Sequence, residues 1–306
     1  MARYIGIDGG ASVTRFVVWD SAEGVIASSR IEEPSAYRLV GVESVVATFR
    51  AGISLLGQNL NVDGIGAGLS GAGRPHDREV LEGVLRGLGV TNHILVASDA
   101  MAALYGALPD AVGVLVIAGT GSIALARNAD GETGRAGGWG HFFPEAGSGF
   151  WFVTEAWQAA LDARDGMGKE TALTERLCKY FGLENCDNVV SLYYSGFEKR
   201  RVASGCPVVL STAADGDVVA QEIVMKGARR LSQMVQAAAS SVGFEGSVGV
   251  STAGGVFQDH VFMKAFQTTL REVAPRISIQ PPLHEPVVGA ALMIAAMSSI
   301  DQFSET

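Results

Sequence analysis

Residues 112–127 read VGVLVIAGTGSIALAR: an apolar run enters a short glycine-containing turn, and a second apolar run leaves it. Apolar, β-branched runs on both sides of such a turn predict a hairpin of two buried strands. The turn, residues 119–122, is not a P-loop, because no Gly-Lys-Ser/Thr follows and the chain leaves it as a strand. Its N–H groups and two hydroxyls suit a phosphate, although an ordinary tight turn explains the same residues.

The same pattern occurs near the start of the sequence. Residues 3–20, RYIGIDGGASVTRFVVWD, again join two apolar runs through a turn rich in glycine and hydroxyl groups. Two equivalent hairpins predict two copies of one αβ unit that face each other, with both turns on one polyphosphate. The first turn adds the carboxylate of Asp8, which suits a magnesium ion that keeps most of its water ligands.

Composition limits the classes of function. The 306 residues suffice for two domains with their own cores. The formal net charge of −9 argues against nucleic acid or an anionic membrane as partner, but not against a nucleotide held by backbone donors and Mg²⁺. No apolar run reaches the roughly 18 residues of a membrane span, and the first residues are too weakly apolar for a signal peptide. Three cysteines at no metal-binding spacing indicate free thiols in a reducing cytoplasm.

The rest of the chain alternates between helical and strand patterns, which predicts an α/β fold. Helices are predicted over residues 42–56, 75–88, 150–163, 171–182, 207–213, 218–242, 259–274 and 287–298. Further strands are predicted over residues 25–31, 62–69, 94–97, 247–252 and 277–280. The charged run 198–201 is predicted to be a solvated face.

Asp99 follows the predicted strand 94–97 and precedes a helix of small residues. An aspartate at that point is a good helix N-cap. The same position, at the carboxyl edge of the sheet, also suits a general base that takes the proton of an alcohol during phosphoryl transfer. The glycine turn one strand later favours the catalytic interpretation, and the two roles are compatible.

Two further loops are candidate walls of a ligand site. Ser70 and Gly71 follow a predicted strand, where ligands bind in open α/β sheets, although a plain connection is the simpler explanation. Gly254 and Gly255 follow another predicted strand, where a glycine pair admits a ring or a phosphate to the backbone.

Residues 135–151 place five glycines among large aromatic side chains. Glycines let a ligand approach the backbone, and Glu145 is the carboxylate there that can accept hydrogen bonds from hydroxyl groups. Trp139 more commonly belongs to a core than to a ligand platform. His141 is interpreted as a structural histidine that bonds to the backbone.

In their order and spacing, these motifs resemble those of the BadF/BadG/BcrA/BcrD-type ATPases and N-acetylglucosamine kinases, within the actin, sugar kinase and Hsp70 superfamily. The motifs are GIDGG (6–10), GAGRP (71–75), SDA (98–100), GTGS (119–122), GGWG (137–140), GS (147–148) and GG (254–255). The resemblance covers nearly the whole chain. It implies two ribonuclease-H-like domains, residues 1–111 plus 286–306 and residues 112–285, with an ATP cleft between the domains.

The resemblance also implies a set of site residues. Asp8 would serve Mg²⁺, and Asp99 would be the base for the sugar hydroxyl. The phosphate of ATP would be held by Gly9, Gly10, Ser12 and Thr14 of the first turn and by Thr120, Gly121 and Ser122 of the second. The sugar pocket would contain Ser70, Gly71, Gly138, Trp139 and Glu145, together with Asp99 and Thr120. Adenosine would be bordered by Ala213, Gly254 and Gly255.

Two departures from the family pattern concern the sugar more than ATP. Relatives often read Gly-Asp-Glu-Gly-Ser where residues 144–148 read Pro-Glu-Ala-Gly-Ser. Glu145 is therefore one methylene longer than the usual aspartate, and Ala146 replaces an acid. Sugar-binding relatives also tend to carry asparagine where Ala36 stands.

The function implied by the resemblance is ATP- and Mg²⁺-dependent phosphorylation of the 6-hydroxyl group of N-acetylglucosamine, or of glucosamine. We expect a cytoplasmic homodimer that acts on a small-molecule sugar and has no nucleic-acid or membrane partner. Two alternatives stay open. One is a non-catalytic sugar or nucleotide sensor. The other is an activator ATPase of the BadF/BadG branch, but Cys178, Cys186 and Cys206 do not form the cysteine ligand set of an iron–sulfur cluster.

Overall fold

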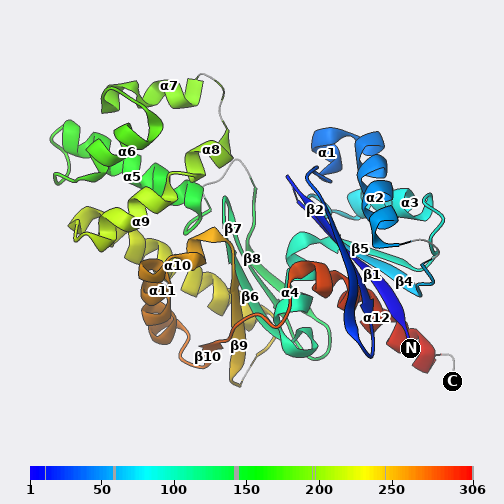
Figure 1. Ribbon diagram of the computed structural model, residues 1–306. Helices are drawn as coiled ribbons and strands as arrows, with labels where there is room; N and C mark the ends of the chain where they lie inside the picture. The colour runs from blue at the N-terminus through cyan, green and yellow to red at the C-terminus, as the bar shows by residue number, and fades with distance from the viewer. Residues whose placement is uncertain are drawn as a thin grey trace. The chain divides into compact units, whose positions relative to one another are not determined.

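The computed structural model describes residues 1–304 with the exception of residues 11, 58–59, 141–144, 195, 197 and 245. The chain divides into two compact units (Figure 1). The first contains residues 1–111 and 282–306, and the second contains residues 112–281. Within the described parts of the chain, none of the helices has both the length and the apolar character needed to span a membrane.

The first unit has a five-stranded mixed sheet in the order β3-β2-β1-β4-β5. The strands are β1 (Arg3–Gly9), β2 (Thr14–Asp20), β3 (Gly24–Ile31), β4 (Gly64–Leu69) and β5 (Ile94–Ser98). Strands β1, β2 and β3 form an antiparallel meander, and β4 and β5 continue the sheet parallel to β1. The predicted hairpin at the start of the sequence is thereby confirmed.

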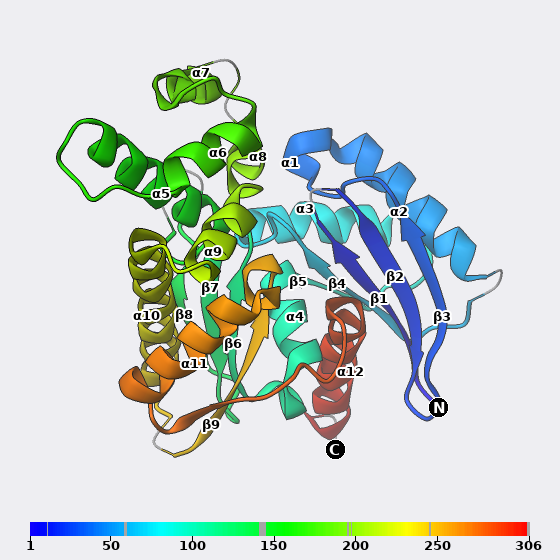
Figure 2. The same cartoon turned by 60° about the vertical axis from the view of Figure 1, so that its left-hand side comes forward.

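Helices cover both faces of this sheet (Figure 2). They are α1 (Tyr37–Val40), α2 (Val42–Leu56), α3 (Pro75–Arg86), α4 (Asp99–Ala107) and α12 (Pro286–Ser304), with a 3₁₀ turn η1 (Pro109–Ala111). Alternation along β1 sends Ile5 and Ile7 into a core with Phe49 of α2 and Leu81 of α3. The opposite face of the sheet packs against α12, where Tyr4 contacts a cluster that includes Ile294.

Helix α12 lies against the strands at backbone distance because glycines face it. A Cβ on Gly6 of β1 would lie 2.1 Å from the carbonyl oxygen of Val287, and a Cβ on Gly66 of β4 would lie 1.9 Å from that of Ala290. On the helix side, a Cβ on Gly289 would lie 2.0 Å from the carbonyl oxygen of Ala102 in α4. No side chain fits at these crossings, so the positions require glycine.

A buried carboxylate ties α1 to α3. Asp77 accepts hydrogen bonds from the hydroxyl of Tyr37 and from the guanidinium of Arg38, whose Nε lies 3.0 Å from Asp77 Oδ1. These two donors lower the pKa of the Asp77 carboxyl below the usual value of 3.8, although burial opposes them. The ionised form of Asp77 therefore stabilises the fold.

We expect stability to fall in acid partly through Asp77. Because its pKa is lowered in the folded state, its contribution is present above the pKa of the unfolded chain and is lost as the pH falls through the lower, folded value. The Asp77→Asn variant should be less stable at neutral pH and should lose less further stability below about pH 4. Urea unfolding midpoints from pH 7 to pH 3 test this, and parallel curves for the variant and the parent would contradict it.

The second unit repeats the sheet of the first, in the order β10-β9-β6-β7-β8. The strands are β6 (Gly113–Ala118), β7 (Ser122–Arg127), β8 (Thr133–Gly137), β9 (Val248–Ala253) and β10 (Ile277–Ile279). Strands β6, β7 and β8 form the antiparallel meander, and β9 and β10 continue parallel to β6. The two sheets are equivalent strand by strand, which confirms the predicted duplication of one unit.

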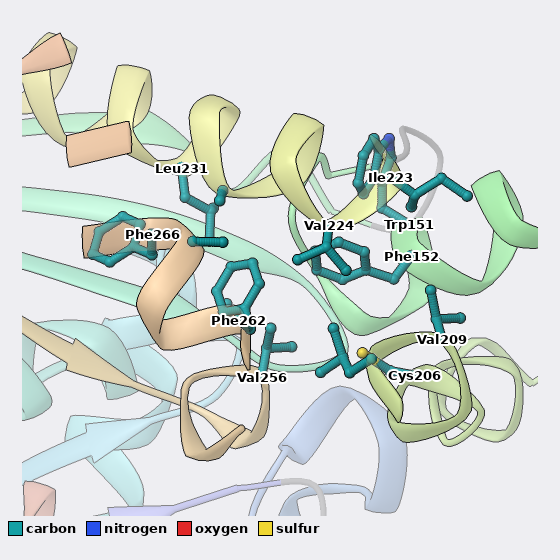
Figure 3. Close-up of a cluster of buried hydrophobic side chains, with 14 of the residues drawn as sticks. Trp151, Phe152, Cys206, Val209, Ile223, Val224, Leu231, Val256, Phe262 and Phe266 are labelled. Atoms are coloured by element: carbon teal, nitrogen blue, oxygen red, sulfur yellow. The ribbon is translucent and has the colours of Figure 1, made fainter. Parts of the chain in front are cut away.

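The helices of the second unit enclose an aromatic core (Figure 3). They are α5 (Gly149–Arg164), α6 (Leu173–Phe181), α7 (Val189–Tyr194), α8 (Lys199–Ala203), α9 (Cys206–Ala214), α10 (Val218–Ser241) and α11 (His260–Val273), with 3₁₀ turns η2 (Cys186–Asn188) and η3 (Gly255–Gln258). Phe152 of α5 packs edge to face on Phe262 of α11 at 5.4 Å between ring centroids. Leu231, on the apolar stripe of α10, packs into the same cluster.

Candidate active site

The carboxyl ends of three parallel strands bring predicted site residues of the first unit to one edge of its sheet. Gly9, the last residue of β1, is in register with Leu69 of β4, which is in register with Ser98 of β5. Ser70 follows directly and donates its N–H to the Gly9 carbonyl oxygen at 2.8 Å. The first glycine turn, Ser70 and Asp99 therefore share the edge at which open α/β sheets bind ligands.

Asp99 is the first residue of α4, but it is not the N-cap. Ser98 caps the helix, since its Oγ accepts a hydrogen bond from the Met101 N–H at 3.2 Å. The capping role considered for Asp99 is thus wrong, and the Asp99 carboxylate instead accepts the Ala100 N–H at 2.8 Å. Burial raises the pKa of Asp99, against the opposing effect of its backbone hydrogen bonds. A carboxylate with a raised pKa is a better proton acceptor than one with the ordinary value.

Asp8 is the second carboxyl of the first unit whose pKa is raised. Burial raises its pKa to about 6; Arg15 opposes this shift, and the charges of Asp99 and Glu285 add to it. Arg15 Nη1 lies 3.6 Å from Asp8 Oδ2. Among the described residues, no three His, Cys, Asp or Glu side chains form a group that could hold a metal ion. A single carboxylate such as Asp8 fits a Mg²⁺ ion that keeps several waters and binds phosphate oxygens.

Two hydroxyl groups near the first turn have different surroundings. The buried Thr14 donates its Oγ1–H to the carbonyl oxygen of Glu33 at 2.9 Å, so its hydroxyl braces the segment after β3. The Oγ of Ser35 is buried without a hydrogen-bond partner and lies so close to Gly9 that a Cβ there would meet it at 1.9 Å. Ser35 therefore packs directly against the backbone of Gly9. Ala36 is the residue that follows Ser35.

The second glycine turn connects β6 to β7. Its backbone closes through the Gly119 N–H, which donates to the Gly121 carbonyl oxygen at 2.9 Å. The buried Ser122 donates its hydroxyl to the carbonyl oxygen of Ala146 at 3.0 Å, so this side chain supports the turn from inside. Thr120 is exposed at the tip and lines a cavity together with Gly119.

This cavity has a volume of about 590 Å³ and lies entirely within the second unit. Its walls come from the glycine turn, the start of α5, the segment α8–α9 and η3: Gly119, Thr120, Gly149, Arg200, Ala203, Ser204, Cys206, Pro207, Leu210, Gly255, Val256, Gln258 and Asp259. The volume is in the range of small-molecule sites. Burial raises the pKa of the Cys206 thiol to about 12, so this thiol stays protonated and has a structural role.

The residues predicted to border adenosine are placed differently from one another. Gly255 lines the cavity. Ala213 of α9 is buried in the hydrophobic core cluster. Leu210, about one turn earlier on the same helix, lines the cavity. Gly254 has φ +97° and faces the carbonyl oxygen of Ala118, where a Cβ would lie at 2.3 Å, so its conformation holds η3 against β6.

The segment 137–140 and Glu145 flank the second turn, whereas His141 lies outside the described residues. Trp139 is exposed, not part of a core, and Arg135 Cζ lies 4.8 Å from its ring centroid. Gly138 has φ +68°, a conformation that glycine adopts freely. Glu145 forms a buried ion pair with Lys199, Nζ to Oε2 being 3.4 Å. The expectation that the whole charged run 198–201 is solvated is therefore wrong for Lys199, the first residue of α8.

Comparison with known proteins identifies the family to which this protein belongs. The sequence matches the BadF/BadG/BcrA/BcrD ATPase family over residues 5–294. The chain belongs to this family, as its motifs predicted. Its two mixed five-stranded sheets match the two-domain, actin-like ATPase fold of sugar kinases.

Individual relatives carry more specific names. The chain is 31% identical over 301 residues to the N-acetylmuramic acid/N-acetylglucosamine kinase of Clostridium acetobutylicum, an alignment that covers 96% of this chain and 98% of the relative. It is 27% identical over 309 residues to the N-acetyl-D-glucosamine kinase of Dictyostelium discoideum, covering 95% and 97%. A solved structure from Chromobacterium violaceum, assigned as an N-acetylglucosamine kinase, superposes with a TM-score of 0.71 at 25% identity over 96% of this chain and 99% of that one.

Proposed function

We propose that this protein is an ATP-dependent kinase that phosphorylates the 6-hydroxyl group of N-acetylglucosamine. The observation that carries the proposal is the Asp99 carboxylate at the carboxyl edge of the first sheet, which has a raised pKa and takes no capping role. The names of the relatives from Clostridium acetobutylicum and Dictyostelium discoideum support the reaction and the sugar. The first of these names adds N-acetylmuramic acid as a second candidate substrate.

In the proposed mechanism, Asp99 orients the acceptor hydroxyl and takes its proton as the oxygen attacks the γ-phosphate. Thr120 and Gly121 of the second glycine turn and Gly9, Gly10 and Ser12 of the first contact the phosphate oxygens. The N–H groups of Gly119 and Gly10 close the turns themselves, because they donate to the carbonyl oxygens of Gly121 and Val13. The cavity of the second unit receives the nucleoside. We propose Ser70 and Gly71 of the first unit and Gly138, Trp139 and Glu145 of the second as the residues that contact the sugar.

We propose Mg²⁺ as the companion of ATP, with Asp8 as its protein ligand. When bound, such an ion neutralises charge on the phosphate oxygens. The support is the position of Asp8 in β1 next to the first glycine turn, where burial raises its pKa to about 6 against the effect of Arg15. Glu285 and Asp99 add to this negative charge without contributing to a three-residue ligand group among the described residues.

A screen of sugars tests the proposed function. ADP release is measured with ATP, Mg²⁺ and, in turn, N-acetylglucosamine, N-acetylmuramic acid, glucosamine, N-acetylmannosamine and glucose. We expect the highest kcat/KM with one of the two N-acetylated glucosamine derivatives, and a ³¹P-coupled proton at C6 of the product. The absence of ADP release with every sugar, combined with calorimetric sugar binding, would replace the kinase by a sensor.

We also propose a cytoplasmic homodimer. The location is supported by Cys178, Cys186 and Cys206, which are free thiols. All three are buried within the second unit, so they offer no surface ligand set for an iron–sulfur cluster, and we expect the purified protein to be colourless. Sedimentation velocity tests the dimer, since a monomer at micromolar concentration would contradict it.

A further inference from the structure

The ammonium group of Lys199 is buried, which is exceptional for a lysine side chain. Its side chain is 6% exposed, and the side chain of its partner Glu145 is 8% exposed. By contrast, Lys169 and Lys226, which also form ion pairs, are 65% and 60% exposed. Removing two charges from water costs several kcal/mol per ion, so a buried pair of this kind contributes little net stability. Stability alone therefore does not account for the Lys199–Glu145 pair.

Among the described residues, three groups near the second glycine turn contact Lys199. Its Nζ is 3.4 Å from Glu145 Oε2 and 3.4 Å from the carbonyl oxygen of Gly140, and it lies 5.3 Å from the ring centroid of Phe150. The ammonium group thus has a carboxylate, a carbonyl and an aromatic face as neighbours, each of which attracts a cation.

The contacts of Glu145 complete the arrangement. Its Oε1 accepts the Gly140 N–H at 3.0 Å. Its Oε2 lies directly against Gly121, where a Cβ would meet it at 2.2 Å. The Glu145 carboxylate therefore touches the second glycine turn, the segment that carries Trp139, and Lys199. Each ionised oxygen keeps further lone pairs for hydroxyl donors after accepting one hydrogen bond.

We propose that Lys199 is a positioning residue for sugar recognition, which holds the Glu145 carboxylate in one orientation beside the second glycine turn. This inference rests on the proposed function. The reach of Glu145 supports it: an aspartate at this position would withdraw the carboxylate by about 1.5 Å, the length of one carbon–carbon bond. The extra methylene of Glu145 thus brings its carboxylate within reach of both the buried Lys199 ammonium group and Gly121.

The test compares two lysines in matched surroundings. Lys226 resembles Lys199 in having a carboxylate partner, Glu155 Oε2 at 2.5 Å, and an aromatic neighbour, Trp151, at 5.5 Å, but its side chain is exposed. Lys199→Met should raise the KM for N-acetylglucosamine about tenfold, with the KM for ATP within about twofold of the parent. Lys226→Met should change neither constant, and Lys199→Arg should restore part of the sugar KM because it keeps the cation.

A double-mutant cycle separates positioning from direct contact. If Lys199 acts through Glu145, the Lys199→Met/Glu145→Gln double variant should bind sugar no more weakly than Glu145→Gln alone. Effects that multiply in the double variant would overturn the inference. An equal rise in both KM values together with a lower melting temperature would also overturn it, since that result indicates support of the fold alone.

A second variant covers the case in which Lys199→Met does not fold. Glu145→Asp leaves the lysine in place and shortens only the carboxylate, and it should raise the sugar KM in the same direction. A parental sugar KM in this variant would overturn the inference. The parent enzyme is assayed alongside: a parent that phosphorylates none of the sugars refutes the proposed function, whereas an active parent with an unaffected Lys199→Met variant refutes the inference alone.

Discussion

Asp99→Asn is expected to lower kcat by roughly 10²- to 10⁴-fold, the usual contribution of a general base, while nucleotide binding stays within about twofold. The amide has nearly the same shape as the carboxylate and can still accept the Ala100 N–H, but it cannot accept the proton of the attacking hydroxyl. Because Ser98 caps α4, the substitution leaves the start of the helix intact. Steady-state ADP release and calorimetry with a non-hydrolysable ATP analogue measure the two effects.

Asp63→Asn is the matched control for this experiment. Asp63 lies in the first unit just before β4 and, like Asp99, accepts a backbone N–H at 2.8 Å, here from Arg3. The control removes one negative charge from the same unit away from the proposed base, so turnover should stay close to that of the parent. A kcat for Asp99→Asn within a few-fold of the control would remove Asp99 from the mechanism.

Gly66→Ala is expected to give the largest loss of stability, about 3 kcal/mol, at the upper end of overpacking costs. The added Cβ would lie 1.9 Å from the carbonyl oxygen of Ala290 and 3.1 Å from Cγ2 of Ile294. The obstacle is helix backbone, which cannot rotate aside as a side chain can, so α12 would have to move away from β4. The thermal unfolding midpoint and the urea midpoint measure the effect.

Gly83→Ala provides the opposite expectation with the same chemical change. Gly83 lies in α3, and a Cβ there would have no heavy atom within 4 Å. Alanine is favoured over glycine inside a helix by up to about 1 kcal/mol, so this variant should be slightly stabilised. Equal midpoints for Gly66→Ala and Gly83→Ala would show that the α12 crossing tolerates a side chain.

The sequence contained strong signals for the two hairpins and for the main helices. Apolar runs on both sides of a glycine turn have few alternative structures, and the repetition of the pattern predicted a repeated unit. Strand β8 escaped prediction because its residues, Thr133–Gly137, include two glycines and no β-branched apolar residue. Helices α7 and α8 escaped because six and five residues are too few to show a helical period.

At the site, the sequence indicated which groups are present but not where they point. Ser98 and Asp99 are both good N-caps, and only the backbone shows that Ser98 takes this role. The hydroxyls of Thr14 and Ser122 belong to the predicted phosphate turns, yet both donate to carbonyl oxygens of neighbouring loops. Lys199 stands in a run of four charged residues, where the sequence gives no sign that one of them faces inward.

The crossing of α12 over the first sheet has a consequence for how the polypeptide matures on the ribosome. Strands β1 and β4 leave the exit tunnel early, but the helix whose carbonyls rest on Gly6 and Gly66 is synthesised only after the whole second unit. The second unit is continuous in sequence and can finish folding while translation proceeds. One face of the first unit's sheet stays uncovered until residues 286–304 have been synthesised, so nascent chains halted before residue 286 should recruit chaperones through that face.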